Sequence, residues 1–145
     1  MTPSRRPRAA ARKPSSPSLP ARSGEAALPP ADARARGLAR RAAVLMLDKK
    51  ASDVVVLDVR GMTSYADWFV LCSGETERQV TATAEFVREK LREEGFRTIG
   101  TEGFESGHWV LLDYGEVVMH LFSTEVRAFY DLDGLWADAP REPVS

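Results

Sequence analysis

The sequence predicts a single small α/β domain in which helices flank one mixed, five-stranded sheet. Three observations predict this fold. A length of 145 residues is typical of one domain. Amphipathic helical segments alternate with short runs of β-branched and aromatic residues, which indicates a sheet layered with helices. Proline is absent between Pro30 and Pro140, and all twelve aromatic residues lie at or after Tyr65, so one continuous stretch holds the core-forming residues.

The first part of this stretch is expected to form a helix followed by two strands. Leu38 and Leu45 share one face at helical spacing and predict a helix over residues 33–48. Residues 53–59 read DVVVLDV and residues 68–72 read WFVLC. Both runs are short and almost wholly apolar, which is typical of strands that are buried on both faces.

A second helix is predicted over residues 75–94. Thr76 and Gln79 have the spacing of a T-x-x-Q capping box, in which the two side chains bond the first backbone N–H groups. An apolar stripe follows at helical spacing. It consists of Val80, Ala84, Val87 and Leu91. Gly95 is typical of the residue just after a helix C-terminus.

A short edge strand over residues 96–101 and a β-hairpin are expected next. Residues 109–114 and 116–122 are two apolar runs joined tightly through Gly115. Both runs are apolar at successive positions. We therefore expect helices over both faces of the sheet.

The domain is predicted to span residues 33–137. Ser123 or Thr124 is expected to cap a short last helix that ends at Tyr130. Residues 138–145 are expected to form a flexible C-terminal tail.

Residues 1–32 are expected to form a disordered basic tail rich in Pro, Arg and Ser. Residues 1–36 carry eight basic and two acidic residues, a net charge of +6, whereas residues 37–145 carry twelve and nineteen, a net charge of −7. Clustered arginines favour contact with the phosphate backbone of a nucleic acid. An organellar transit peptide is the alternative, because no acid precedes Glu25.

Composition excludes several classes of protein. The single cysteine, Cys72, excludes an internal disulfide framework, and His108 and His120 are the only histidines, which leaves few metal ligands. A lone cysteine in a strand is usually a small buried hydrophobe. No apolar run approaches the length of a membrane span. A reducing compartment, the cytoplasm, is therefore the expected location.

The sequence lacks the residues that two classes of enzyme require. Residues 54–61 resemble the first glycine loop of a methyltransferase but contain one glycine where that loop needs several. Residues 72–74 resemble the small-residue turn of nucleotidyltransferases, but no carboxylate pair for Mg²⁺ follows on the next strand. Asp131 and Asp133 have the spacing of a metal pair, although a turn is the simpler interpretation. We expect no catalytic residue, metal or cofactor.

The segment over residues 107–136 reads GHWVLLDYGEVVMHLFSTEVRAFYDLDGLW. This segment resembles the ribosomal silencing factor family, also called Iojap or RsfS. Upstream, residues 67–70 (DWFV), 73–74 (SG) and 79–80 (QV) resemble the same family. The resemblance covers about residues 36–136, with an aromatic swap in the DWF segment.

The resemblance implies a nucleotidyltransferase-like α/β fold without an active site. It also implies a partner, the large ribosomal subunit, bound through ribosomal protein fourteen of that subunit. The factor would then sterically block joining of the small subunit and repress translation when nutrients are short. Organellar relatives imply an alternative role in large-subunit biogenesis. Neither a membrane nor a small-molecule substrate is implied. An acidic folded part suits a basic ribosomal protein.

The candidate partner-binding residues lie in the C-terminal third, which is dense in aromatic side chains and arginine. They are Trp109, Asp113, Tyr114, His120, Phe122, Arg127, Tyr130, Leu132 and Trp136. Asp113 and Tyr114 are expected to be exposed at the hairpin tip. Arg127 is expected either to pair with Asp131 at i, i+4 or to meet the partner. The aromatic residues could instead belong to the core.

Overall fold

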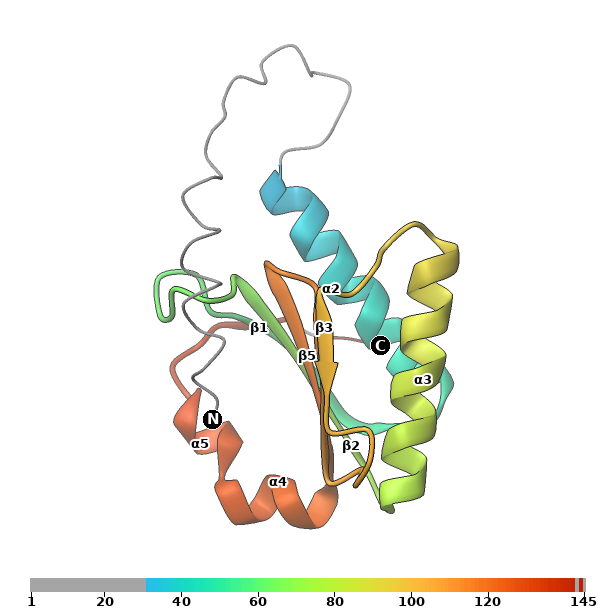
Figure 1. Ribbon diagram of the computed structural model, residues 1–145. Coiled ribbons are helices and arrows are strands. Elements are labelled where there is room, and N and C mark those ends of the chain that lie inside the picture. The colour runs from blue at the N-terminus through green and yellow to red at the C-terminus, as the bar shows by residue number, and fades with distance from the viewer. Residues whose placement is uncertain (1–30, 143, 145) are drawn as a thin grey trace.

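The computed structural model describes residues 31–142 and 144. They form one mixed sheet with the strand order β3-β4-β5-β2-β1-β6, and helices α2 and α3 pack side by side on one face of it (Figure 1). The elements are α2 Ala31–Asp48, β1 Ser52–Asp58, β2 Trp68–Gly74, α3 Glu77–Glu93, β3 Gly100–Glu102, β4 Trp109–Asp113, β5 Val117–Ser123, α4 Thr124–Tyr130, α5 Leu132–Leu135 and β6 Arg141–Glu142. The predicted α/β fold is confirmed, with a sixth, two-residue strand added to the expected five.

Strands β2 and β5 form the centre of the sheet. They pair in parallel, and all seven residues of each are buried, as their apolar sequences predict. Side chains alternate between the two faces. Val70 and Met119 belong to the core under α2 and α3, whereas Phe69 and Phe122 belong to a second cluster on the opposite face.

Helix α2 ends in a Schellman motif. The N–H of Ala51 donates to the carbonyl of Met46 and the N–H of Lys50 donates to the carbonyl of Leu47. Lys50 therefore takes the left-handed conformation, with φ at +64°, where glycine is the usual residue. Helix α2 begins at Ala31, so the expected tail boundary at residue 32 falls inside the helix. Residues 1–30 lie outside the described residues.

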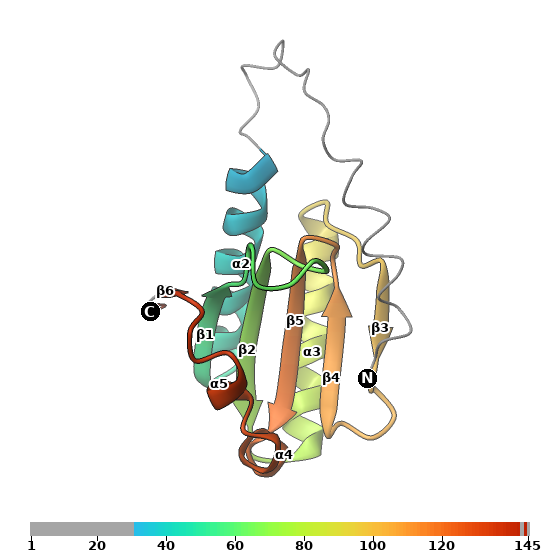
Figure 2. The same ribbon diagram turned by 90° about the vertical axis from the view of Figure 1, so that its left-hand side faces the viewer.

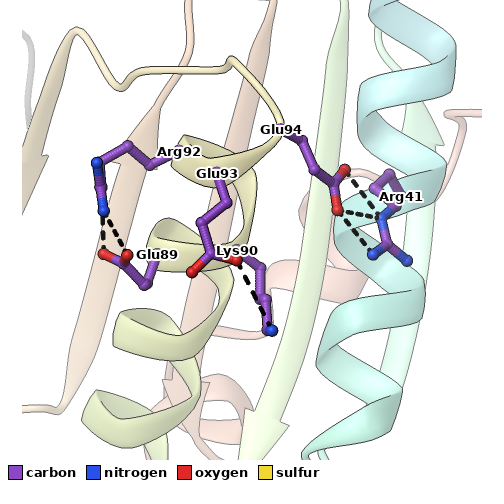
Figure 3. Close-up of polar contacts among 6 residues, drawn as sticks. All are labelled: Arg41, Glu89, Lys90, Arg92, Glu93 and Glu94. Atoms are coloured by element: carbon purple, nitrogen blue, oxygen red, sulfur yellow. Dashed lines mark hydrogen bonds and ion pairs between the residues drawn. The ribbon is translucent and has the colours of Figure 1, made fainter.

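Helix α3 begins with the predicted cap. The Thr76 side chain accepts from the N–H of Gln79 at 3.0 Å, and the Gln79 amide oxygen accepts from the N–H of Glu75 at 2.8 Å. At the other end of α3, the carboxylate of Glu94 accepts hydrogen bonds from two nitrogens of Arg41 in α2. This forked ion pair links the two helices (Figure 3). Gly95 follows with φ at +98°.

The C-terminal segment is ordered further than expected. We expected a flexible tail over residues 138–145, but Arg141–Glu142 pairs antiparallel with β1, and Ala139 is buried. Glu142 also forms ion pairs with Arg36 and Arg40 of α2. These long-range pairs hold β6 beside the N-terminal helix.

The expectation that helices cover both faces of the sheet is wrong in part. Helices α4 and α5 lie at one end of the second face and along its margin, so most of β2, β5 and β4 faces the viewer without a helix of the described residues in front of it (Figure 2). Side chains cover this face instead. The half-buried residues Tyr65, Trp109, Leu111 and Trp136 pack over Phe69, Leu71 and Phe122.

Candidate functional site

The face of the sheet opposite α2 and α3 gathers most of the candidate residues. Because side chains alternate along a strand, Trp109 of β4 and both His120 and Phe122 of β5 point to this same side. The paired residues Trp109 and Phe122 lie directly opposite one another across the two strands. We call the connected rings on this side the aromatic face. Its members are Phe69, Trp109, His120, Phe122, Tyr130 and Trp136.

Trp109 is the hub of the aromatic face. Its ring centroid lies 5.2 Å from that of Phe122, 6.0 Å from that of His120 and 5.6 Å from that of Tyr130. Such spacings are within the range at which aromatic pairs add favourable contacts beyond the area they bury. Trp109 is only half-buried, so one side of the hub remains accessible.

His120 is fixed in this arrangement by a hydrogen bond. The indole N–H of Trp109 donates to Nδ1 of His120 across 3.2 Å. An imidazole nitrogen can accept such a bond only when it carries no proton. The His120 ring is 7% exposed and packs edge-on against Phe69 at 4.8 Å. His120 therefore positions Trp109 from inside the domain.

Phe69 connects His120 to Trp136, the residue that follows α5. Its ring lies 5.0 Å from Trp136 in an edge-to-face pair. The sequence did not mark Phe69 as a site residue. Strict alternation along β2 could have placed it, because Phe69 and Leu71 share a face while Trp68 and Val70 share the other.

Arg127 lies inside the domain, which corrects both expectations for it. The residue is 7% exposed, and its Nη1 donates to the carbonyl of Asp53 at 2.8 Å and to the hydroxyl of Ser73 at 2.9 Å. Asp131 instead donates a backbone hydrogen bond from its N–H to the carbonyl of Arg127. Arg127 thus ties α4 to β1 and to the end of β2.

The position of Arg127 bears on the enzyme hypothesis. Strands β2 and β5 are adjacent and parallel, and the chain leaves β2 towards one edge of the sheet and β5 towards the other. In open α/β sheets, ligands bind in the crevice beyond the strand ends at such a switch point. Here Arg127 lies between the two strand ends, bonded to Ser73 and 5.9 Å from the Phe122 ring.

Asp113 and Tyr114 are not exposed as expected. Asp113 is 5% exposed, and its Oδ1 accepts from the N–H of Gly115 at 2.9 Å, which closes the hairpin turn. Tyr114 packs against the core under α2 and α3, on the other side of the sheet from Trp109. Burial raises the pKa of its phenol to about 12. The structure therefore separates Tyr114 from the aromatic face.

Helices α4 and α5 present the most exposed apolar residues of the described chain. Phe129 is 78%, Leu135 66% and Tyr130 54% exposed. Sequence reasoning selected Tyr130 but missed Phe129 and Leu135. The sequence offered no signal for them, because their exposure follows from the inward turn of Arg127, which depends on tertiary contacts. Leu132 lies in α5, and its side chain is outside what the structure describes.

The other side chains that could take part in catalysis or metal binding, those of Cys72, His108 and Asp131, lie in surroundings that favour a structural role. Burial raises the pKa of the Cys72 thiol to about 12, so the thiolate needed for nucleophilic attack is disfavoured. The exposed His108 pairs with Glu77 at 3.0 Å. Asp131 accepts from the N–H of Gly134, the turn that the sequence favoured over a metal pair. Among residues 31–142 and 144, no group of three or more His, Cys, Asp or Glu side chains is placed to hold a metal ion.

Comparison with known proteins assigns the family. A family model described as "Ribosomal silencing factor during starvation" matches residues 31–145, which include every described residue. The chain belongs to the ribosomal silencing factor family. The resemblance found in the sequence is thereby confirmed.

Individual members of the ribosomal silencing factor family match most of the folded part. The ribosomal silencing factor RsfS of Bacillus subtilis is 38% identical over 105 residues, which are 72% of this chain and 89% of that protein. The RsfS of Halalkalibacterium halodurans is 44% identical over 93 residues, 64% of this chain and 80% of that protein. A crystal structure of a Chromobacterium violaceum protein superposes with a TM-score of 0.69 at 37% identity, covering 75% of this chain and 89% of that one.

None of the helices of this family member in the described residues is long and apolar enough to cross a lipid bilayer. The geometry offers one largely helix-free sheet face with a partly exposed tryptophan, bordered by the apolar residues of α4 and α5.

Proposed function

We propose that the protein binds the large ribosomal subunit through ribosomal protein fourteen of that subunit and so blocks joining of the small subunit. Bound there, it represses translation under nutrient limitation without chemical turnover. The observation that carries the proposal is the family match, which spans the whole described domain rather than a fragment of it.

The charge of the folded part supports a protein partner. Residues 37–145 carry a net charge of −7, and ribosomal proteins that contact RNA are basic. Opposite charges on two surfaces accelerate association and disfavour wrong partners. An acidic domain is a poor direct ligand for ribosomal RNA, because the phosphates repel it.

The position of Arg127 at the ends of β2 and β5 supports a mechanism without turnover. The side chain of Arg127 lies where a nucleotide would enter a related enzyme, and its Nη1 already donates to Ser73 and Asp53. A thermal-shift series with nucleoside triphosphates and Mg²⁺ tests this part. We expect no saturable rise in melting temperature, whereas a rise of the size that mass action gives for a true ligand would restore the enzyme hypothesis.

The basic N-terminal residues are proposed to add contacts to ribosomal RNA. Residues 1–30 carry six basic residues and one acidic residue, and they lie outside the described part of the chain. Replacing those six bases by glutamine should weaken binding and flatten its salt dependence, because each phosphate contact releases counterions. Unchanged salt dependence would contradict this contribution.

Cosedimentation with separated ribosomal subunits tests the binding proposal. The parent protein should pellet with the large subunit and stay in the supernatant with the small one. Large subunits reconstituted without ribosomal protein fourteen provide the control and should not retain the protein. Equal binding to both subunits, or to neither, would overturn the proposal.

A further inference from the structure

We propose that the apolar surface of α4 and α5 is the docking site for a basic segment of the protein partner, with Phe129 and Leu135 as its principal contacts. This inference rests on the proposed function and names the surface that carries it. We call this surface the α4–α5 patch. It consists of Phe129, Tyr130 and Leu135, the three most exposed large apolar residues of the described chain.

The three residues of the α4–α5 patch are more exposed than the other large apolar residues of the described chain. The other exposed large apolar residues are Val44, Met62, Phe96 and Ile99, each exposed by 51% or less and lying in α2, in the β1–β2 connection or in the α3–β3 connection. Phe129 at 78% and Leu135 at 66% stand apart from them. Apolar clusters on a surface mark interaction sites, whereas single exposed residues need no explanation.

Phe129 and Tyr130 of the α4–α5 patch are linked by ring contacts to the aromatic face. The ring of Phe129 packs edge-on against Tyr130 at 4.9 Å, and Tyr130 packs against the hub Trp109 at 5.6 Å. Helix α4 is fixed at its start by Ser123, which accepts from the N–H of Val126, and from below by the buried Arg127. A surface that is already ordered loses little conformational entropy on binding.

Charge around the patch specifies the chemistry of the partner. Residues 124–140 contain four acidic residues and one basic residue. That basic residue, Arg127, is buried and directed inward, while Glu125, Asp131 and Asp138 are exposed. The surface therefore combines apolar side chains with negative charge. It fits a basic protein segment that also carries apolar side chains, and it repels a phosphate backbone.

Binding of full-length variants to isolated large subunits tests the inference. Phe129→Ser and Leu135→Ser should each weaken binding by about tenfold or more, because truncating a central apolar contact commonly has this effect. Ile99→Ser, at an exposed residue in the α3–β3 connection, is the matched control and should bind as the parent does. All three changes are at exposed positions, so circular dichroism and melting temperature should stay close to those of the parent.

A charge reversal tests the polarity of the partner. Glu125→Lys in α4 should weaken binding at low salt, and the difference from the parent should shrink as salt is raised. Glu85→Lys makes the same change at an exposed position of α3 and should have a smaller effect. Stronger binding by Glu125→Lys would show that the patch faces RNA and would overturn the inference.

The outcomes separate this inference from the function on which it rests. If the parent binds the large subunit and both serine variants bind equally well, the patch assignment is wrong while the function stands. If the parent fails to bind, both fall. Sedimentation velocity tests whether a second copy of the protein occupies the patch instead. Self-association that Phe129→Ser abolishes, with ribosome binding unchanged, would identify the patch as an interface between two copies and overturn the inference.

Discussion

The guanidinium of Arg127 donates to the hydroxyl of Ser73 across 2.9 Å, although the two residues are 54 positions apart in the chain. The same nitrogen donates to the carbonyl of Asp53 at 2.8 Å. This one side chain links α4 to two strands and lies between the ends of β2 and β5. It supports the helix that carries the α4–α5 patch, and it lies at the strand ends where open α/β sheets bind ligands.

Arg127→Met should destabilise the domain by about 2–4 kcal/mol, because it removes a buried cation and leaves the buried hydroxyl of Ser73 and the carbonyl of Asp53 without their donor. Urea unfolding measures the free energy of unfolding. Arg78→Met, at an exposed arginine in the first turn of α3, is the control and should change that energy by less than about 0.5 kcal/mol. Equal effects of the two substitutions would contradict the structural role of Arg127.

Tyr114→Phe should leave the free energy of unfolding unchanged or raise it by up to about 1 kcal/mol. The Tyr114 hydroxyl is buried and has no hydrogen-bond partner in the described residues, so removing it removes an unsatisfied polar group. In the parent, ultraviolet titration should show one phenol ionising near pH 12, because burial raises its pKa to about 12. A loss of more than 1 kcal/mol in Tyr114→Phe would show that the hydroxyl is bonded.

Lys50→Gly should stabilise the protein by about 0.5–1 kcal/mol. Lys50 has φ at +64° in the Schellman motif of α2, a conformation that costs a side-chain-bearing residue energy and glycine almost none. Lys49→Gly is the control, because Lys49 is not among the residues with positive φ and should gain nothing. Thermal unfolding compares the two, and a larger gain at Lys49 would contradict the argument.

Acid should weaken the contact between Asp58 and Arg60. The forked hydrogen bonds from Arg60, of 2.9 and 2.6 Å, lower the pKa of the Asp58 carboxyl from its usual value near 4. A carboxyl with a lowered folded-state pKa contributes stability above about pH 4, and this contribution is lost as pH falls through the lowered pKa.

The parent and Asp58→Asn should therefore differ by less than about 1 kcal/mol at neutral pH and converge in acid. Urea unfolding at a series of pH values measures this difference. In an Arg60→Met background the same substitution should show a smaller difference that depends less on pH. A difference that grows in acid would have the wrong sign for this contact.

Local sequence signals predicted the elements whose causes are local. Thr76 with Gln79, Gly95 and Ser123 each mark a helix end through bonds to nearby backbone groups, and these ends are confirmed. Strand β6 was missed because two residues carry no periodic signal. Its position depends on Arg36 and Arg40, more than a hundred residues away.

The candidate site was predicted less well, for the same reason. Trp109, His120 and Phe122 were selected from the segment that resembles the family, and they do lie together because the register of β4 and β5 puts them on one face. Arg127 is buried because of tertiary contacts to Asp53 and Ser73 that have no sequence signature, whereas the carboxyl of Asp113 turns inward to a local bond with the N–H of Gly115. Phe129 and Leu135 were passed over because an apolar residue in a short helix is usually counted as core, whereas here the inward position belongs to an arginine.

Subunit joining followed by light scattering tests the central claim most directly. Purified small and large subunits are mixed after the large subunits have been titrated with the full-length protein. A steric block predicts that joining falls in proportion to occupancy and is abolished at about one copy per large subunit, with no effect of incubation time. Protein added after the subunits have joined should leave the signal unchanged at first. Inhibition by far less than one copy per subunit, increasing with time, would show turnover and contradict the account.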